Sequence, residues 1–232
     1  MKILELFSGS RSIGKVAEKR GHKVFSSDFI DFPNTNYVCD ILDFNINKIP
    51  FDKVDVLWSS VPCETFSIAS VRYHWEKGYV FKPKTKRAEK GIKILNKTIE
   101  IIEKLLIKNP KMLWYVENPR GKMRKSPIWK NIIHKRDTIT YCQYETDKKR
   151  EERRMKPTDI WHNNPLWISK TMCKNGDTCH QSAPRGSQTG TQGIKTYYDR
   201  SKVPTNLCEE IIRASEKGYK PKKNRQLRLK LN

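Results

Sequence analysis

The sequence predicts an α/β fold in which helices cover both faces of a doubly wound, mostly parallel sheet. Short, mostly apolar runs of strand length recur at residues 3–7, 54–58 and 112–116, a further strand is predicted at residues 23–27, and helical patterns follow the first run and precede the last. A polar residue follows each run. Since the carboxyl ends of parallel strands meet at one sheet edge and hold ligands there, we expect the functional groups at that edge.

The composition indicates the class of partner. The 232 residues fit one domain with a sizeable core, and 47 Lys and Arg against 25 Asp and Glu give a formal net charge of +22. A field of this size favours nucleic acid over an anionic membrane, with a generally basic surface as the alternative. The longest apolar runs, such as residues 105–107, are far too short to span a bilayer.

The amino terminus and the cysteines indicate the compartment. Glu5 interrupts the apolar start where a signal peptide needs an unbroken run, so we expect a cytoplasmic protein, in the host cytoplasm if a phage encodes it. The six cysteines are scattered without a disulfide-like framework, which suits a reducing compartment. They are Cys39, Cys63, Cys142, Cys173, Cys179 and Cys208.

The first strand opens a unit typical of nucleotide binding. It is followed by Ser8 and Gly9 and then by a helical pattern over residues 15–20, which Gly21 ends as a carboxyl cap. Gly9 would let the backbone approach a ligand closely. The spacing is not the dinucleotide fingerprint, so a plain structural turn stays open as the alternative.

Two aspartates follow the next strands. Asp28 ends the second strand, where an acidic residue commonly accepts hydrogen bonds from ribose hydroxyls, and Asp40 follows a short strand at residues 36–38. Either aspartate could instead be a solvated strand terminus.

Pro62 and Cys63 follow the fourth strand. A thiol held there by a stiff proline turn is a candidate nucleophile. The alternative is a buried cysteine that acts as a small hydrophobe. Glu117 follows the fifth strand and is a candidate acid or hydrogen-bond partner for a substrate held against Cys63, or else a capping or ion-paired carboxylate.

The segments between these strands differ in character. Residues 68–90 interleave aromatic and basic side chains, which favours a loop that faces nucleic acid over a disordered one. Residues 90–108 predict an amphipathic helix. Its core stripe is Ile94, Thr98, Ile101, Ile102, Leu105 and Leu106.

The second half predicts a sixth strand at residues 138–143 and a strand pair interrupted by the charge run 148–154. The spacing of Cys173, Cys179 and His180 resembles part of a zinc site, but no clear fourth ligand accompanies them, and we assign no metal. Arg185 lies in a Gly, Ser and Gln segment suited to a DNA groove, with an ordinary polar loop as the alternative.

Taken in order, these motifs resemble the DNA cytosine-5 methyltransferases. Residues 4–9 (Leu-Glu-Leu-Phe-Ser-Gly) resemble the family's first motif, Pro62-Cys63 its catalytic motif, and Glu117-Asn118 its Glu-Asn motif. Residues 200–204 resemble the run before the last family helix. The family's Gln-x-Arg-x-Arg motif has no clean copy, and Arg154 or its neighbour Arg153 is the candidate for its arginine.

The resemblance implies a methyltransferase of the Rossmann-like type that uses S-adenosylmethionine. It implies that Cys63 attacks carbon 6 of a flipped-out cytosine, and that Glu117 and Arg154 complete the catalytic set. The implied cofactor residues are Phe7, Ser8, Gly9, Asp28, Asp40 and Ile41, and the implied substrate residues are Pro62, Ser67, Asn118 and Arg185.

The resemblance also implies a layout and a partner. We expect a catalytic core at residues 1–162, a small target-recognition region at 163–198, a returning helix at 199–216 and a basic tail at 217–232. The expected partner is double-stranded DNA, bound by a monomer, and the compact size suggests a phage or mobile-element origin. An RNA cytosine-5 methyltransferase and an inactive DNA-binding member of the fold stay open as alternatives.

Overall fold

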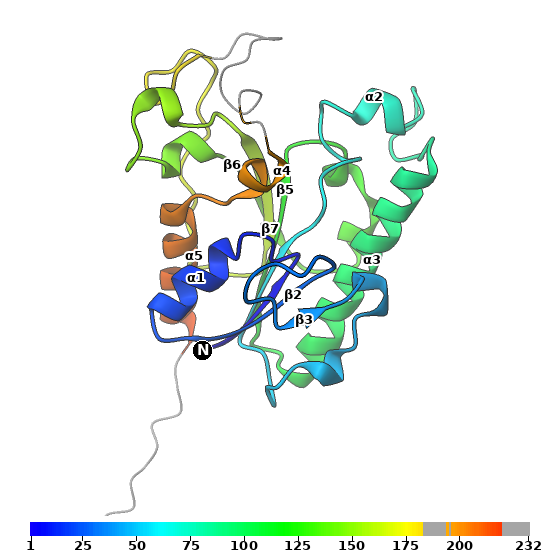
Figure 1. Ribbon diagram of the computed structural model, residues 1–232. Helices are drawn as coiled ribbons and strands as arrows, with labels where there is room; N and C mark the ends of the chain where they lie inside the picture. Colours follow the sequence, from blue (N-terminus) through cyan, green and yellow to red (C-terminus); the bar gives the residue numbers. More distant parts are fainter. Residues whose placement is uncertain (183–193, 195, 220–232) are drawn as a thin grey trace, which may run out of the picture.

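The computed structural model describes residues 1–182, 194 and 196–219 (Figure 1). In this part of the chain, seven strands form one sheet in the order β3-β2-β1-β4-β5-β7-β6. The strands are β1 (Lys2–Leu6), β2 (Lys23–Asp28), β3 (Tyr37–Val38), β4 (Val56–Ser60), β5 (Leu113–Pro119), β6 (Lys135–Thr140) and β7 (Pro157–His162). The first five are parallel, whereas β7 lies antiparallel between β5 and β6. The predicted doubly wound, mostly parallel sheet is confirmed.

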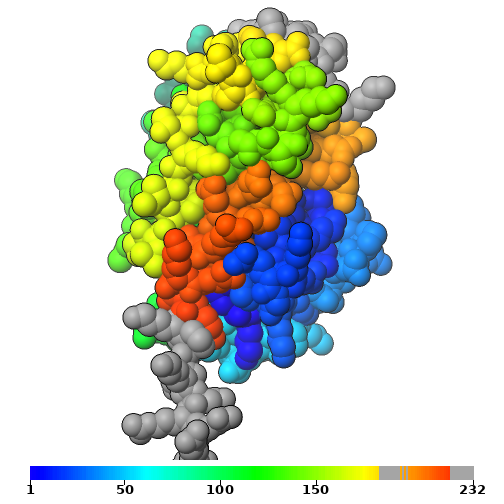
Figure 2. All heavy atoms as spheres, turned by 90° about the vertical axis from the view of Figure 1, so that its left-hand side faces the viewer, coloured from blue at the N-terminus to red at the C-terminus, as the bar shows by residue number. Residues whose placement is uncertain are grey.

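The helices lie in two layers. Helices α1 (Ser12–Lys19) and α5 (Thr205–Gly218) pack on one face of the sheet and α3 (Lys86–Lys108) on the other. Figure 2 shows α1 and α5 side by side over the first face. The shorter elements are α2 (Val71–His74), α4 (Tyr197–Ser201), η1 (Ile41–Asp43), η2 (Ile46–Lys48), η3 (Lys122–Lys125), η4 (Pro127–Lys130), η5 (Tyr141–Tyr144) and η6 (Arg150–Glu152). No helix of the described residues is long and apolar enough to cross a bilayer.

The central strands are buried on both faces, as parallel strands covered by two helical layers must be. In β1, Ile3 packs toward α1 and α5, while Leu4 and Leu6 pack toward α3. In β4, Val56 and Trp58 face the first layer and Leu57 the second. This alternation explains why the strands read as continuous apolar runs in the sequence.

Two helix boundaries show how local chemistry sets the elements. Helix α1 ends before Gly21, which takes a left-handed backbone at φ 80° and donates its amide to Glu18, as the sequence predicts. Helix α3 begins at Lys86, four residues earlier than expected, because the Thr85 side chain caps it by accepting the Ala88 amide at 3.3 Å. Four residues of the predicted stripe are buried, together with Leu95 and Ile99 beside it, whereas Ile94 and Leu106 are half-buried against the core.

The sixth strand differs from its predicted range. It covers Lys135–Thr140, and the following residues form the 3-10 turn η5, whose Tyr141, Cys142 and Tyr144 are buried. The chain leaves the sheet at Tyr141 because this turn packs into the α1 and α5 layer instead of continuing the strand. Strand β7 then returns between β5 and β6.

The aromatic segment after Cys63 is ordered, so disorder was the wrong alternative for residues 68–90. Trp75 is buried, donates its indole Nε1–H to the Thr65 carbonyl at 2.7 Å and packs against Phe66 and Phe81. Tyr73 and Tyr79 stay exposed. The segment is therefore a packed lobe beside the carboxyl edge of the sheet, with α2 at its outer end (Figure 1).

Candidate active site

A cavity of about 360 Å³ opens at the carboxyl ends of β1, β2 and β4. Phe7 lines it after β1, Asp28 at the end of β2, and Pro62 after β4, while Asp40 and Ile41 close another side. These strands meet where the chain order reverses along the sheet, between β1 and β4. Open α/β sheets bind ligands at this switch point.

The turn after β1 lies against the end of β2. Phe7 and Gly9 take left-handed backbones, at φ 54° and 44°, and the Gly9 amide donates to Asp28 Oδ2 at 2.9 Å. The Ile30 amide donates to the other Asp28 oxygen at 3.1 Å. Ser8 Oγ is buried and has no hydrogen-bond partner within the described residues. The turn thus carries an unused hydroxyl beside a carboxylate that fixes its shape.

Asp40 differs from Asp28 in its surroundings. Its side chain caps η1 by accepting the Leu42 amide at 3.0 Å, and its other oxygen contacts Lys90 Nζ at 3.3 Å. The Leu42 amide, followed by Lys90, holds the pKa of Asp40 below its usual value. Asp40 is therefore an anion that positions the loop carrying Ile41 along the cavity.

Glu5 holds the start of α1, just after the turn at Phe7, Ser8 and Gly9. We did not infer this role from the sequence. Its carboxylate is buried and accepts the Ile13 and Gly14 amides at 3.2 and 3.1 Å, at the start of α1. Burial raises its pKa to about 7. A Cβ at position 14 would clash with Glu5 Oε2, so a larger residue there would displace the Glu5 carboxylate. An acidic residue inside an otherwise apolar strand was the available signal.

Cys63 stands three residues beyond β4 and is exposed. Its carbonyl accepts the Phe66 and Ser67 amides, both at 3.0 Å, which closes a tight turn around the thiol. Asn118 Nδ2–H donates to the Val61 carbonyl at 2.7 Å, and Ser67 forms a bridge with Gly121. The continuation of β5 therefore holds the Pro-Cys turn in place.

The protein around Cys63 disfavours its thiolate. Desolvation raises the pKa of the thiol, the Lys156 ammonium lowers it, and the Glu117 carboxylate raises it again. The net shift is upward, so the resting thiol is mostly protonated at neutral pH. Lys156 is thus the cation whose charge favours the Cys63 thiolate. Its Nζ also donates to the Arg200 carbonyl at 3.2 Å.

Glu117 lies on β5 beside Ser60 of β4 and is buried. Tyr141 donates its hydroxyl to Glu117 Oε1 at 2.8 Å, and the Arg154 guanidinium lies 5.4 Å from the Tyr141 ring. Arg154 in turn donates its backbone N–H and Nε–H to Glu145 at 2.6 and 2.7 Å. A continuous set of contacts thus leads from Glu145 to Glu117.

The sequence-predicted residues fall into three groups. The cavity brings together Phe7, Asp28, Asp40, Ile41 and Pro62, with Ser8 and Gly9 in the adjoining turn. The second group lies in or near the Pro-Cys turn and consists of Cys63, Ser67, Glu117, Asn118 and Arg154. Arg185 lies outside the described residues.

The two candidate arginines, Arg153 and Arg154, have different surroundings. Arg153 donates to the backbone carbonyls of Lys148 and Cys179, whereas Arg154 donates to Glu145.

Sequence reasoning missed Tyr141, Glu145 and Lys156. Tyr141 was expected inside a strand, and only the turn at η5 aims its hydroxyl at Glu117. A charge run such as residues 148–154 is normally a solvated face, yet Arg154 is buried. A tyrosine inside an expected strand carried no signal of this contact.

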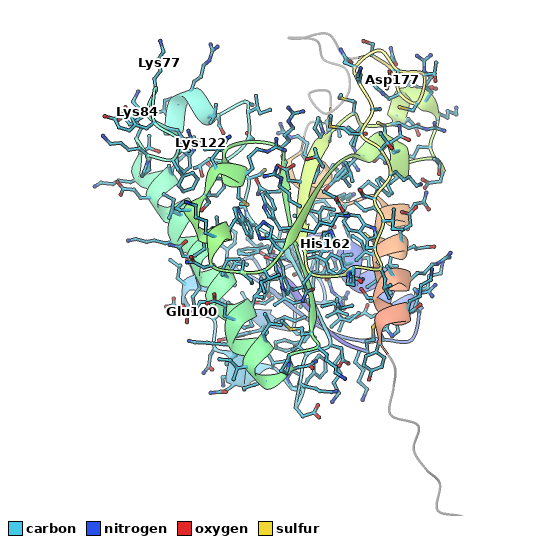
Figure 3. The ribbon with its side chains drawn as sticks, turned by 180° about the vertical axis from the view of Figure 1, so that it is seen from behind. Lys77, Lys84, Glu100, Lys122, His162 and Asp177 are labelled. Atoms are coloured by element: carbon cyan, nitrogen blue, oxygen red, sulfur yellow. The ribbon has the colours of Figure 1, made fainter. Side chains whose placement is uncertain are left out.

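A basic groove of about 480 Å³ lies beside the Pro-Cys turn. Arg120, Lys122, Arg124 and Lys125 line it together with Tyr79. Lys122 Nζ donates to the Tyr79 carbonyl at 3.1 Å, and Figure 3 shows Lys122 on the same side of the molecule as Lys77 and Lys84 of the lobe. Cations after β5 therefore gather against the lobe that carries the exposed aromatic rings.

The sheet order, the antiparallel β7 and the cavity at the switch point define a Rossmann-like α/β protein with a ligand site at the carboxyl edge of its sheet. A probable DNA (cytosine-5)-methyltransferase of Frog virus 3 (isolate Goorha) is 30% identical over 183 residues, which cover 77% of this chain and 78% of that protein. The chain belongs to the DNA (cytosine-5)-methyltransferase family. No protein-family model matches it.

Solved structures with a similar outline include methyltransferases. The Entamoeba histolytica methyltransferase EhMeth gives a TM-score of 0.45 at 13% identity, covering 74% of this chain and 56% of that one. A Spodoptera frugiperda DNMT2 mutant gives 0.44 at 18% identity, covering 73% and 55%. This chain spans about half the length of these two proteins.

Proposed function

We propose that this protein transfers a methyl group from S-adenosylmethionine to carbon 5 of a cytosine in double-stranded DNA, through a transient bond between Cys63 and carbon 6. One juxtaposition carries the proposal. Pro62 lines the cavity at the switch point, the next residue presents an exposed thiol, and Glu117 is buried on the strand paired with β4.

The residues around the cavity fit S-adenosylmethionine. Ser8 Oγ is an unpartnered buried hydroxyl within the described chain, and the Asp28 carboxylate lines the cavity, so both suit the polar groups of a nucleoside and an amino acid. Phe7 and Ile41 supply apolar surface for a base. A volume of about 360 Å³ lies within the usual range of small-molecule sites, roughly 300–1,000 Å³.

We assign the cofactor contacts accordingly. The turn at Phe7, Ser8 and Gly9 lies under the cofactor, Asp28 accepts from the ribose hydroxyls, and Asp40 with Ile41 faces the adenine. When bound, S-adenosylmethionine supplies an electrophilic methyl group on its sulfonium. Everything else in the reaction falls to this chain's own side chains.

Cys63 and Glu117 divide the chemistry at the cytosine. Carbon 5 is a poor nucleophile, so the Cys63 thiolate first adds to carbon 6 and makes carbon 5 electron-rich. Glu117 holds the ring nitrogen and the exocyclic amine, which offsets the charge that develops during the addition. After transfer, carbon 5 loses its proton, and the electron pair left behind breaks the carbon–sulfur bond and returns the thiolate.

Four supporting side chains position this pair. Tyr141 fixes the Glu117 carboxylate through its hydroxyl, and Arg154 lies over the tyrosine ring. Lys156 lowers the pKa of Cys63 and so favours the attacking thiolate. Asn118 fixes the Val61 carbonyl two residues before the thiol. We assign Arg154, together with this set, to transition-state support.

The DNA must expose its base to this site. Carbon 6 is stacked inside a duplex, so the cytosine has to leave the helix at a cost of a few kcal/mol. The basic groove around Lys122 and Lys125 offers phosphate contacts beside Cys63, and the net charge of +22 supplies long-range attraction. We assign target recognition to residues 163–198, which include Arg185. We assign Pro62, Ser67 and Asn118 to contacts with the substrate base.

Labelled-methyl transfer to duplex DNA tests the proposal. The protein is incubated with methyl-labelled S-adenosylmethionine and a mixed-sequence duplex, and the product nucleosides are separated. We expect 5-methylcytosine from the native chain and from Cys208→Ala, a control that removes a buried cysteine of α5 away from the cavity. Cys63→Ala should give no product while it still binds the cofactor.

Two other outcomes would redirect the assignment. Label in RNA but not in DNA would overturn the assignment of DNA as the substrate and leave the proposed methyl-transfer reaction unchanged. Tight DNA binding without cofactor binding or transfer would identify an inactive DNA-binding member of the fold.

A further inference from the structure

A cluster of three cysteines and one histidine lies outside the candidate active site. Cys142 comes from η5, and Cys173, Cys179 and His180 come from the irregular segment after β7. One ligand atom of each residue lies within 4.8 Å of every other. Cys142, Cys173 and His180 are buried, and Cys179 is half-buried. The sequence showed three of these four groups, and the fold supplies the fourth from 31 residues before Cys173.

Three of the four separations are close to those around one tetrahedral metal ion, and the Cys142–Cys173 separation is shorter. With zinc–sulfur bonds near 2.3 Å, two thiolates on one zinc lie about 3.8 Å apart, and a thiolate and an imidazole nitrogen slightly less. Cys179 Sγ is 3.8 Å from Cys142 Sγ and 3.3 Å from His180 Nδ1. Cys173 Sγ is 3.8 Å from His180 Nδ1 and 3.1 Å from Cys142 Sγ. Four ligand atoms therefore converge on one point.

The surroundings hold these atoms as a metal site requires. Gln143 Nε2–H lies 3.4 Å from Cys179 Sγ, and the Cys173 amide donates to Thr140 Oγ1 at 3.1 Å. Outer contacts of this kind orient metal ligands. His180 Nδ1 contacts the sulfur atoms of Cys173 and Cys179, and Nε2 has no partner in the described chain.

Two arginines lie against the same residues. Arg150 Nε–H donates to the His180 carbonyl at 3.0 Å, and Arg153 donates to the Cys179 carbonyl at 3.3 Å. Three thiolates and one divalent ion carry a net charge of −1, which nearby guanidinium groups stabilise. Arg153 thus serves the cluster, while Arg154 next to it serves Glu145.

We propose that Cys142, Cys173, Cys179 and His180 bind one zinc ion in a closed structural site. Three soft thiolates and one imidazole are a ligand set typical of zinc, and four protein ligands leave no position for a substrate. The site is distinct from the methyl-transfer site.

The position of the site explains its use. Between Asn163 and Ser182 the described chain forms no helix and no strand, so little secondary structure orders it. The zinc would fasten this segment to the residue next to Tyr141. Figure 3 shows Asp177 of this segment at the same end of the molecule as Lys77, on the opposite side. Because metal binding free energy becomes folding free energy, this cross-link would order the segment that we assign to target recognition.

Metal analysis of the full chain tests the proposal without reference to methyl transfer. The protein is purified without a histidine tag, passed over chelating resin and analysed for metals. We expect about one zinc per chain. Replacing the zinc with cobalt(II) should give the intense visible bands of tetrahedral coordination together with thiolate-to-cobalt charge-transfer bands, and this spectrum does not require any variant to fold.

Variants localise the ion. Cys179→Ser changes the most accessible thiol of the cluster. This variant and His180→Ala should each reduce the zinc content below one per chain and lower the melting temperature. Cys208→Ala, the matched buried-cysteine control, should keep its zinc. A folded native chain that neither retains nor takes up zinc or cobalt would overturn the proposal. So would a disulfide between Cys142 and Cys173 in fresh protein, or undiminished zinc in both cluster variants.

Discussion

The Tyr141 hydroxyl donates a 2.8 Å hydrogen bond to Glu117 Oε1, joining a turn that leaves the sheet to the carboxylate proposed to bind the base. Both side chains are buried. Burial, followed by the charge of the Glu117 carboxylate, raises the pKa of Tyr141 well above its usual value. The phenol therefore stays a donor throughout the working pH range, and Glu117 keeps a fixed orientation.

Tyr141→Phe tests this contact. The substitution removes a hydrogen bond to a charged acceptor, which is worth roughly 1.5–3 kcal/mol, without removing the ring. We expect a lower kcat for methyl transfer and a free energy of unfolding lower by about 1–3 kcal/mol. Denaturant unfolding and steady-state kinetics measure both effects, with Tyr73→Phe, an exposed ring on the α2 lobe, as the control. An unchanged kcat would show that the contact has no part in catalysis.

The raised pKa of Cys63 predicts a pH dependence. Because desolvation outweighs the attraction of Lys156, the reactive thiolate should increase as the pH rises past the usual cysteine range. Alkylation of Cys63 by iodoacetamide, followed by peptide mass spectrometry in the absence of DNA, should therefore accelerate from pH 7 to beyond pH 9.

Lys156→Gln removes the cation that lowers this pKa. Alkylation at neutral pH should become slower, and the midpoint of the pH profile should move upward. Lys170→Gln is the control, since its ammonium lies near Glu210 and Tyr144 instead. A profile unaffected by Lys156→Gln would remove that residue from thiol activation.

Glu5 predicts that stability falls as the pH rises. Burial raises its pKa from 4.5 to about 7 in the folded chain, so the folded state binds a proton that the unfolded state releases between these values. The stabilisation is present below about pH 4.5 and is lost as the pH rises through about 7, by up to roughly 3 kcal/mol.

Glu5→Gln keeps the shape and removes this titration. Urea unfolding at pH 5 and pH 8 should show a smaller difference for the variant than for the native chain. Equal differences would mean that Glu5 does not titrate in this window.

Several site residues could be predicted because strand ends are visible in sequence. Asp28, Cys63 and Glu117 each follow a predicted strand, and parallel strands bring such ends to one edge. Cys142 and Tyr141 could not be found this way, because their partners lie 31 and 24 residues away along the chain. Their contacts depend on the chain leaving the sheet at η5, which side-chain packing decides and periodicity does not reveal.

Asp28 predicts a measurable loss of cofactor affinity. Asp28→Ala removes the proposed ribose acceptor and the anchor of the Gly9 amide, so calorimetry should show S-adenosylmethionine binding weakened about tenfold or more, the equivalent of one good hydrogen bond. Asp31→Ala, an exposed neighbour that does not line the cavity, should bind like the native chain. Native affinity in Asp28→Ala would move the cofactor away from this cavity.

Trapping the covalent adduct tests the central proposal most directly. Duplex DNA containing 5-fluorocytosine, incubated with S-adenosylmethionine, cannot lose fluorine from carbon 5, so the carbon–sulfur bond should persist through denaturing gel electrophoresis. We predict an adduct with the native chain that peptide mass spectrometry assigns to Cys63, and none with Cys63→Ala. An adduct that persists in Cys63→Ala, or 5-methylcytosine formed from normal DNA by that variant, would contradict the account.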